Sequence, residues 1–450
     1  MLQNINTIVI LMMEGRSFDH LLGHLSLSGG AYEGRLAGLS GTPVDGFLRD
    51  ERYASSCEGR VFYPFEQRDG VLPACLQEDR LSVAISLGRT SPSGERAMDG
   101  FVRASRHVDR AIRAARSVPM GFLRTADAPV TSFLARNYAI CDQYFAPLPS
   151  GTVPNRLMAM SGASFLEDNS PRLLPHHSTV FDWMRERGVR YRVYHDGVSF
   201  FALCPWMHDE ILSDRFREAS RLGEDFTREP DASFPEVVFV EPSYGAAPVQ
   251  QGKAPNDNRA PSAMAPGERF LLKVYEALTS NPERFSRTLF LVTYASHGGF
   301  YDHVAPPSLG RGGGSARSMG VRVPSLVISP WVAPNTVYSG LLDHTSILQL
   351  IAERFGDGHP YSDAVRERAE LGVGSLSQVI NLETPRAACL STPRLPERRG
   401  RRPRHTTCSE AVALEQAFYL GARALCERAP SRFYRESPEL WRAVSFSELH

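Results

Sequence analysis

Hydrophobic residues in this chain gather into short runs, separated by longer stretches in which apolar positions recur with the period of a helix. A run without polar alternation predicts a strand that is buried on both faces of a sheet. Such runs are Ile5–Met13, Val189–Tyr194, Glu236–Val240, Leu289–Tyr294 and Val323–Ile328. The helical pattern covers Phe18–Leu25, Pro129–Tyr138, Leu157–Ser161, Thr179–Arg187, Gly267–Leu278 and Thr345–Phe355. This alternation predicts an α/β fold with a doubly wound, mostly parallel sheet, helices on both faces, and loop insertions over the carboxyl edge.

The chain is predicted to divide into three parts. Residues 1–384 carry the α/β pattern, and residues 385–407 are rich in proline and arginine, which predicts a linker. Residues 408–450 form a helical C-terminal segment that contains the predicted helix Ser409–Glu427. A basic run such as this linker is usually a solvated connector, with binding to nucleic acid or acidic lipid as the alternative.

Polar side chains collect where two of the predicted strands end. Glu14 follows the first strand, and Ser296, His297, Asp302 and His303 surround a Gly-Gly turn after the central one. In open α/β sheets, ligands bind outside the carboxyl ends of the strands. The sequence therefore predicts a functional site at this edge of the sheet.

The amino-acid composition limits the classes of molecule that we expect the protein to bind. The chain of 450 residues has 50 basic and 50 acidic residues, and this balance argues against nucleic acid as a partner. Apolar runs are too short to span a membrane, and the N-terminus lacks the basic region of a secretion signal. We therefore expect a cytoplasmic protein without a membrane span, which acts on a small molecule. The sequence gives no indication of its oligomeric state.

The cysteines carry no metal-binding pattern. They lie at positions 57, 75, 141, 204, 389, 408 and 426, without a C-x-x-C pair. A dispersed, odd set of this kind predicts free thiols in a reducing compartment.

Four stretches together resemble the phosphoesterase family, which includes bacterial phospholipases C and an acid phosphatase within the alkaline-phosphatase superfamily. They are residues 8–20 (IVILMMEGRSFDH), 151–157 (GTVPNRL), 256–261 (NDNRAP) and 293–304 (TYASHGGFYDHV). The resemblance covers roughly residues 5–385 in the expected order. It implies an alkaline-phosphatase-like fold and the hydrolysis of phosphate ester bonds.

The chain departs from the family pattern at the positions that bind a divalent metal. The family's first strand ends Glu-Asn-Arg-Ser-Phe-Asp, and here Glu14 is kept while the Asn position is Gly15. The central strand usually ends Asp-Glu-His-Gly-Gly, and here the two carboxylates are replaced by Ala295 and Ser296. A hard cation needs several oxygen ligands, and Glu14 alone supplies one carboxylate. We therefore expect no tightly bound metal and no other cofactor.

The candidate site residues come from two sources, the polar residues that follow the predicted strands and the resemblance to the phosphoesterase family. Thr152 lies at the family's nucleophile position, and an expected histidine near residues 72–84 is absent. Arg259 replaces a phosphate-facing histidine, which keeps anion affinity but removes a proton donor. The predicted catalytic residues are Thr152, Glu14, His297 and His303. The predicted substrate-binding residues are Arg259, Arg156, Asp302, His195 and Asn256.

Each of these residues also has a purely structural interpretation. Thr152 can be a turn residue, His297 can brace the glycine turn, and Arg156 can anchor backbone carbonyls. We expect the chain to be a phosphoester hydrolase that takes an anionic or amphipathic substrate. The alternatives are a metal-independent enzyme of different chemistry on the same scaffold, for example a biosynthetic one, and a binding protein without catalysis.

Overall fold

A single large sheet organises the protein. The computed structural model describes residues 1–27, 32, 35–36, 44–67, 75–89, 96–105, 118–248, 254–310, 319–389, 391–395 and 409–445. Within these residues the sheet has eight strands, in the order β12-β6-β11-β10-β1-β9-β7-β8. Their bounds are Thr336–Tyr338, Ala139–Cys141, Ser325–Ile328, Thr288–Tyr294, Thr7–Met13, Val237–Glu241, Tyr191–His195 and Phe216–Glu218.

The predicted fold class is confirmed. β10, β1, β9, β7 and β8 are parallel neighbours, and β12 is parallel to β6, whereas β11 runs antiparallel to both β10 and β6. All five predicted strands are present. β1 and β10 are fully buried along their whole length, as continuous apolar runs predict.

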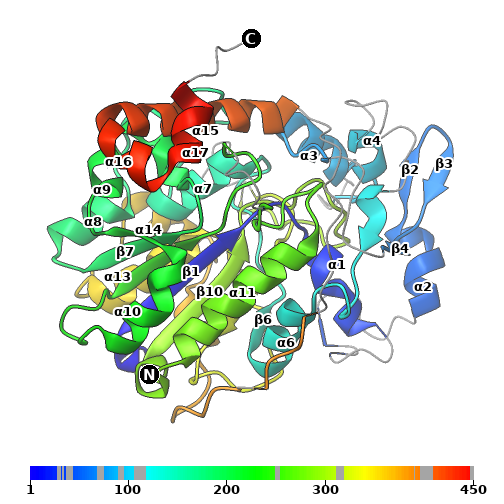
Figure 1. The fold of residues 1–450 in the computed structure, drawn as a ribbon. Coiled ribbons are helices and arrows are strands. Elements are labelled where there is room, and N and C mark those ends of the chain that lie inside the picture. The colour runs from blue at the N-terminus through cyan, green and yellow to red at the C-terminus, as the bar shows by residue number, and fades with distance from the viewer. Residues whose placement is uncertain are drawn as a thin grey trace.

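Helices cover both faces of the sheet (Figure 1). On one face, α11 (Met264–Thr279) packs against α6 (Pro129–Asn137) and α10 (Leu222–Arg228). On the other, α7 (Thr152–Ser161) packs against α13 (Thr345–Phe355), and both lie against Ile10 and Met12 of β1. The helix α8 (Val180–Glu186) was also predicted.

α11 shows how the pattern specifies the packing. Its buried apolar residues Phe270, Leu271, Val274, Tyr275 and Leu278 recur at helical spacing and form one stripe. This stripe faces the sheet, while the polar side of the helix faces solvent.

Two predicted helices differ from the observed ones. Phe18–Leu25 is a short α1 (Phe18–Leu21) followed by a 3-10 turn (Gly23–Ser26). Leu157–Ser161 is only the second half of α7, which begins at Thr152. Pro154 lies in the first turn of α7, where a backbone N–H has no partner in the helix, so proline is tolerated there.

The C-terminal helix α15 (Ser409–Arg428) matches its prediction and docks on the α/β core. Together with α16 (Pro430–Glu436) and α17 (Pro438–Ser445), it lies at the top of the molecule in Figure 1. Phe418 is buried, with its ring 5.2 Å from Tyr244 and 6.4 Å from Phe200. The predicted linker, residues 385–407, falls partly outside the described residues. In the described part of the chain, no helix is both long and apolar enough to cross a bilayer.

The prediction that all cysteines are free thiols is wrong at one position. Cys57, Cys141, Cys204, Cys389 and Cys426 form no disulfide bond, but Cys75 is disulfide-bonded. Cys408 lies outside the described residues. Spacing along the chain does not reveal which thiols meet in space, so this bond could not be predicted from the sequence.

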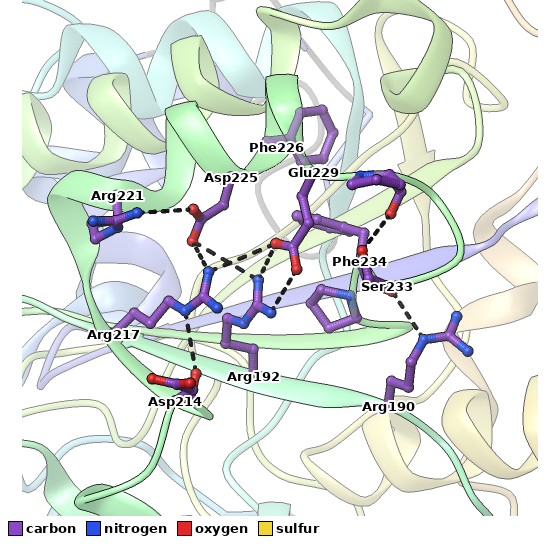
Figure 2. Close-up of polar contacts among 12 residues, drawn as sticks. Arg190, Arg192, Asp214, Arg217, Arg221, Asp225, Phe226, Glu229, Ser233 and Phe234 are labelled. Atoms are coloured by element: carbon purple, nitrogen blue, oxygen red, sulfur yellow. Dashed lines mark hydrogen bonds and ion pairs between the residues drawn. The ribbon is translucent and has the colours of Figure 1, made fainter.

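An ion-pair cluster fixes the outer strands of the sheet (Figure 2). Arg192 on β7 donates to both carboxylate oxygens of Glu229, at 2.6 and 3.0 Å. Arg217 on β8 and the Tyr194 hydroxyl donate to Asp225 of α10, at 2.8 and 2.9 Å. Because these charges are paired within the fold, the cluster ties β7 and β8 to α10.

Candidate active site

The site begins where β1 and β10 end side by side. Met13 is paired with Tyr294 in the parallel register, so both strands stop at the same level. The next residues stay in contact, since the Ala295 N–H donates to Met13 O at 2.9 Å and the Arg16 N–H to Ser296 O at 3.1 Å. The predicted meeting of these two strand ends is confirmed.

Two glycines permit this close approach. Gly15 has φ +49° and Gly298 has φ +64°, a region that residues with a side chain rarely adopt. A Cβ at Gly298 would lie 2.2 Å from the carbonyl oxygen of Gly15. Any side chain at position 298 would therefore push the two turns apart.

Thr152, the first residue of α7, faces Glu14. Its hydroxyl donates to Glu14 Oε2 at 2.7 Å. Arg156, one helical turn further on, donates from Nε and Nη2 to Glu14 Oε1 at 2.8 and 2.6 Å, and from Nη2 to Met12 O at 2.9 Å. Both side chains therefore meet the carboxylate at the end of β1. The structure thus brings together three of the predicted site residues, Glu14, Thr152 and Arg156.

Glu78 and Arg259 complete this group. Arg259 donates from Nη1 to Thr152 Oγ1 at 3.0 Å and forms an ion pair from Nη2 to Glu78 Oε1 at 2.9 Å. The Ser296 hydroxyl donates to Glu78 Oε2. Glu14, Glu78 and Thr152 are each 1% exposed and Arg259 is 8% exposed. The carboxylates and the guanidinium therefore neutralise one another in the interior, where water does not reach them.

Glu78 is the functional residue that sequence reasoning missed. It lies in the stretch where the family resemblance calls for a histidine, and the sequence shows a carboxylate there instead. The segment containing Glu78 reaches the site by packing on the glycine turn, since a Cβ at Gly299 would lie 2.5 Å from Leu76 Cβ and 2.8 Å from Gln77 O. Only a search for any ionisable group near residues 72–84 would have found it.

The donor set does not fit the divalent cation that the resemblance implies. Arg156 and Thr152 occupy the two oxygens of Glu14, and Arg259 and Ser296 occupy those of Glu78. A hard cation needs about six or more oxygen ligands whose lone pairs are free to coordinate it. Here the guanidinium of Arg259 lies between the two carboxylates instead.

Asp302 and His303 form a second polar group, at the start of α1. His303 Nδ1 lies 2.6 Å from Asp19 Oδ2, and Asp302 Oδ1 accepts from Arg322 Nε at 2.9 Å. Arg322 also donates to Asp19 Oδ1 at 3.1 Å. Ligand atoms of Asp19, Asp302 and His303 lie within 4.8 Å of one another, but Arg322 already supplies the positive charge. His303 is therefore paired with Asp19, not with its neighbour in sequence.

His195 and Asn256 hold loops near the same edge of the sheet. His195 Nδ1 lies 2.6 Å from Gly197 O. Asn256 donates from Nδ2 to Asp196 at 2.6 Å and accepts from the Ser243 N–H at 2.6 Å. These contacts pin the loops that follow β7 and β9, and the predicted substrate-binding role of both residues stays a prediction.

His297 is buried and neutral. Desolvation lowers the pKa of its imidazole to about 3. Its ring lies 6.2 Å from the ring of Phe101, and its Nε2 is buried without a hydrogen-bond partner in the described part of the chain. A group with so low a pKa is a weak base at neutral pH, so His297 suits general-base catalysis poorly.

This burial predicts a specific pH dependence. A histidine whose pKa is depressed in the folded state contributes stability that is lost as the pH falls below its unfolded value of about 6.5. We therefore expect the destabilisation caused by His297→Met to shrink by ~1.4 kcal/mol between pH 7.5 and pH 5.5, because the variant has no imidazole to protonate on unfolding. Urea unfolding of both proteins at the two pH values measures this difference. A gap between the proteins that is independent of pH would contradict a neutral, buried His297.

Comparison with known proteins places this geometry in a family. Among solved structures, a phosphonate monoester hydrolase of Agrobacterium radiobacter is 12% identical over 57% of this chain and 72% of its own, with a TM-score of 0.33. The non-specific phospholipase C3 of Arabidopsis thaliana is 28% identical, covering 88% of this chain and 77% of that protein. Phospholipase C A of Mycobacterium tuberculosis is 28% identical, covering 85% of this chain and 78% of that protein.

The family profile decides the assignment. The profile described as "Phosphoesterase family" matches residues 5–356, which span β1, β10, Thr152 and Arg259. The relatives named above make the chain similar to hydrolases of the phospholipase C type. This protein therefore belongs to the phosphoesterase family.

Proposed function

We propose that this protein hydrolyses phosphate ester bonds with Thr152 as the nucleophile. The observation that carries the proposal is the position of the Thr152 hydroxyl. It donates to the carboxylate of Glu14 at 2.7 Å and accepts from the guanidinium of Arg259 at 3.0 Å. A hydroxyl held between a base and a cation has the arrangement that an activated nucleophile needs.

The reaction proceeds in two steps on these residues. Glu14 takes the proton of Thr152 while Oγ1 attacks phosphorus, and the alcohol leaves with the electron pair of the broken P–O bond and takes a proton from water. The hydroxide left by this water then attacks the phosphothreonine, and Thr152 Oγ1 leaves with the electron pair of the second broken P–O bond and recovers the proton from Glu14. Arg259 offsets the negative charge on the phosphoryl oxygens in both steps.

The surroundings support an anionic, amphipathic substrate. Two guanidiniums, of Arg156 and Arg259, flank Thr152 and favour a phosphate group. The rings of Phe200 and Tyr244 lie 5.0 and 5.1 Å from the guanidinium of Arg156 and add apolar surface beside it. The names of the relatives, phospholipases C, point to the same class of phosphodiester.

Turnover of two chromogenic esters tests the proposal. We expect the protein to release p-nitrophenolate from p-nitrophenylphosphocholine, a diester, or from p-nitrophenyl phosphate, a monoester. Peptide mass spectrometry after acid quenching should find the phosphoryl group on Thr152. Absence of turnover of both esters by folded protein, or a phosphoryl group on another residue, would contradict the proposal.

A further inference from the structure

We infer that the guanidinium of Arg259 takes the place of the divalent cation in this site, with Glu78 as its holding partner. The inference rests on the proposed function and specifies how its charge is supplied. Arg259 Nη1 lies 3.0 Å from Thr152 Oγ1 and 3.8 Å from Glu14 Oε2, and Nη2 lies 2.9 Å from Glu78 Oε1. One planar cation therefore contacts the nucleophile and both carboxylates at once.

The charges of the group are complete without a metal. Glu14 and Glu78 supply two negative charges, and Arg156 and Arg259 supply two positive ones, all at most 8% exposed. A divalent cation added to these four groups would leave excess buried positive charge, of which Asp257 and Glu241, two further buried acids close to the arginines, would offset only part. Uncompensated buried charge is strongly unfavourable. Tight metal binding therefore requires that Arg259 leave the site.

The backbone aims Arg259 at Thr152. Its N–H donates to Asp257 Oδ1 at 3.0 Å, and Asn258 before it has φ +69°. The Asn258 carbonyl accepts from Arg16 Nε at 2.8 Å. These contacts hold the backbone of the turn in place. The side chain of Arg259 therefore starts from a fixed position and can point towards Thr152.

Gly15 lies beside the stem of Arg259. A Cβ at Gly15 would lie 3.7 Å from Arg259 Cγ and 3.3 Å from Gly298 Cα. The first distance is an ordinary van der Waals contact, so the constraint on a side chain at position 15 comes from its φ of +49° and from the backbone of Gly298. Position 15 is therefore bordered by Gly298 and by the stem of Arg259.

A guanidinium in place of a divalent cation changes how the Thr152 hydroxyl can be activated. A guanidinium stays protonated at every physiological pH and donates directional hydrogen bonds, but it brings one positive charge where a metal brings two. It lowers the pKa of a neighbouring hydroxyl less than a divalent cation does, so deprotonation of Thr152 depends on the Glu14 carboxylate.

Calorimetric titration with Mn²⁺ tests the inference without any measurement of activity. We expect no saturable binding to the wild-type protein and one Mn²⁺ per chain in Arg259→Ala, where Glu14 and Glu78 lose their shared cation. The double variant Arg259→Ala/Glu78→Gln should lose this binding again. Arg192→Ala removes another buried arginine, in the cluster of Figure 2, and should gain no Mn²⁺ at the active site.

The outcomes separate this inference from the proposed function. Stoichiometric Mn²⁺ on the wild-type protein that is lost in Glu14→Gln would overturn the inference, whether or not esters are hydrolysed. A folded Arg259→Ala that binds no Mn²⁺ would also overturn it. Circular dichroism reports folding, and Arg259→His, which carries the residue expected in the family, replaces the alanine variant if that one unfolds. The binding pattern described above, found in a protein without turnover, would uphold the inference and refute only the proposed function.

Discussion

Replacing Thr152 by alanine is expected to lower kcat for phosphate ester hydrolysis by at least about 10³-fold, because the variant has no hydroxyl to attack phosphorus. The remaining charges of Glu14 and Arg259 can still assist attack by water, so a small residual rate is expected. Initial rates of p-nitrophenolate release at saturating ester measure the effect. The phosphoryl group that mass spectrometry is expected to find at position 152 should be absent from the same variant.

Two variants on the same helix serve as controls. Thr152→Ser keeps a hydroxyl beside Glu14 and should retain most of the activity. Ser161→Ala removes a hydroxyl at the other end of α7, where it donates to Leu157 O at 2.8 Å, and should leave kcat unchanged. A folded Thr152→Ala whose kcat stays within tenfold of the wild type would show that another group is the nucleophile.

Arg322→Leu is expected to destabilise the protein by about 3–5 kcal/mol. Arg322 is fully buried and donates to Asp302 at 2.9 Å, to Asp19 at 3.1 Å and to Asp142 O at 2.8 Å. Its removal leaves two buried carboxylates without their cation. Urea unfolding at pH 8 measures the change in the free energy of unfolding.

The pH dependence of this loss identifies its cause. Desolvation raises the pKa of Asp302 even beside Arg322, and without the arginine the folded state favours the protonated carboxyls more strongly. A raised folded pKa means that stability is lost as the pH rises, so the penalty of Arg322→Leu should be smaller at pH 5 than at pH 8. Arg366→Leu, which removes an exposed arginine with surface ion pairs, should cost at most about 1 kcal/mol. Equal losses in the two variants would contradict a special role for the buried cation.

The sequence was sufficient to predict the framework of the site. Continuous apolar runs identify β1 and β10 as buried strands, and the polar residues that follow them lie at the shared carboxyl edge. The direction of β11 was not predictable, because an apolar run has the same pattern in a parallel and an antiparallel strand. The start of α7 was placed too late because Pro147–Arg156 is rich in turn-forming residues, although proline is acceptable in a first helical turn.

Contacts between distant segments were the part that the sequence did not reveal. Glu78 meets Arg259 only because its segment folds over Gly299, and no local pattern around residues 72–84 marks that path. His303 does not pair with the adjacent Asp302, because side chains next to each other in an extended segment point in different directions. Its partner is instead Asp19 of α1. The cytoplasmic location inferred from the N-terminus stays a prediction.

The close approach of the turns at Gly15 and Gly298 has a consequence for how such a site can change over generations. A lineage that introduced asparagine at position 15 would strain the backbone, which has φ +49° there, and would crowd Gly298, whose Cα lies 3.3 Å from the added Cβ. One that lost the arginine first would leave Glu14 and Glu78 repelling each other in the interior. Each single step therefore passes through a less stable protein, which makes the present arrangement difficult to reverse.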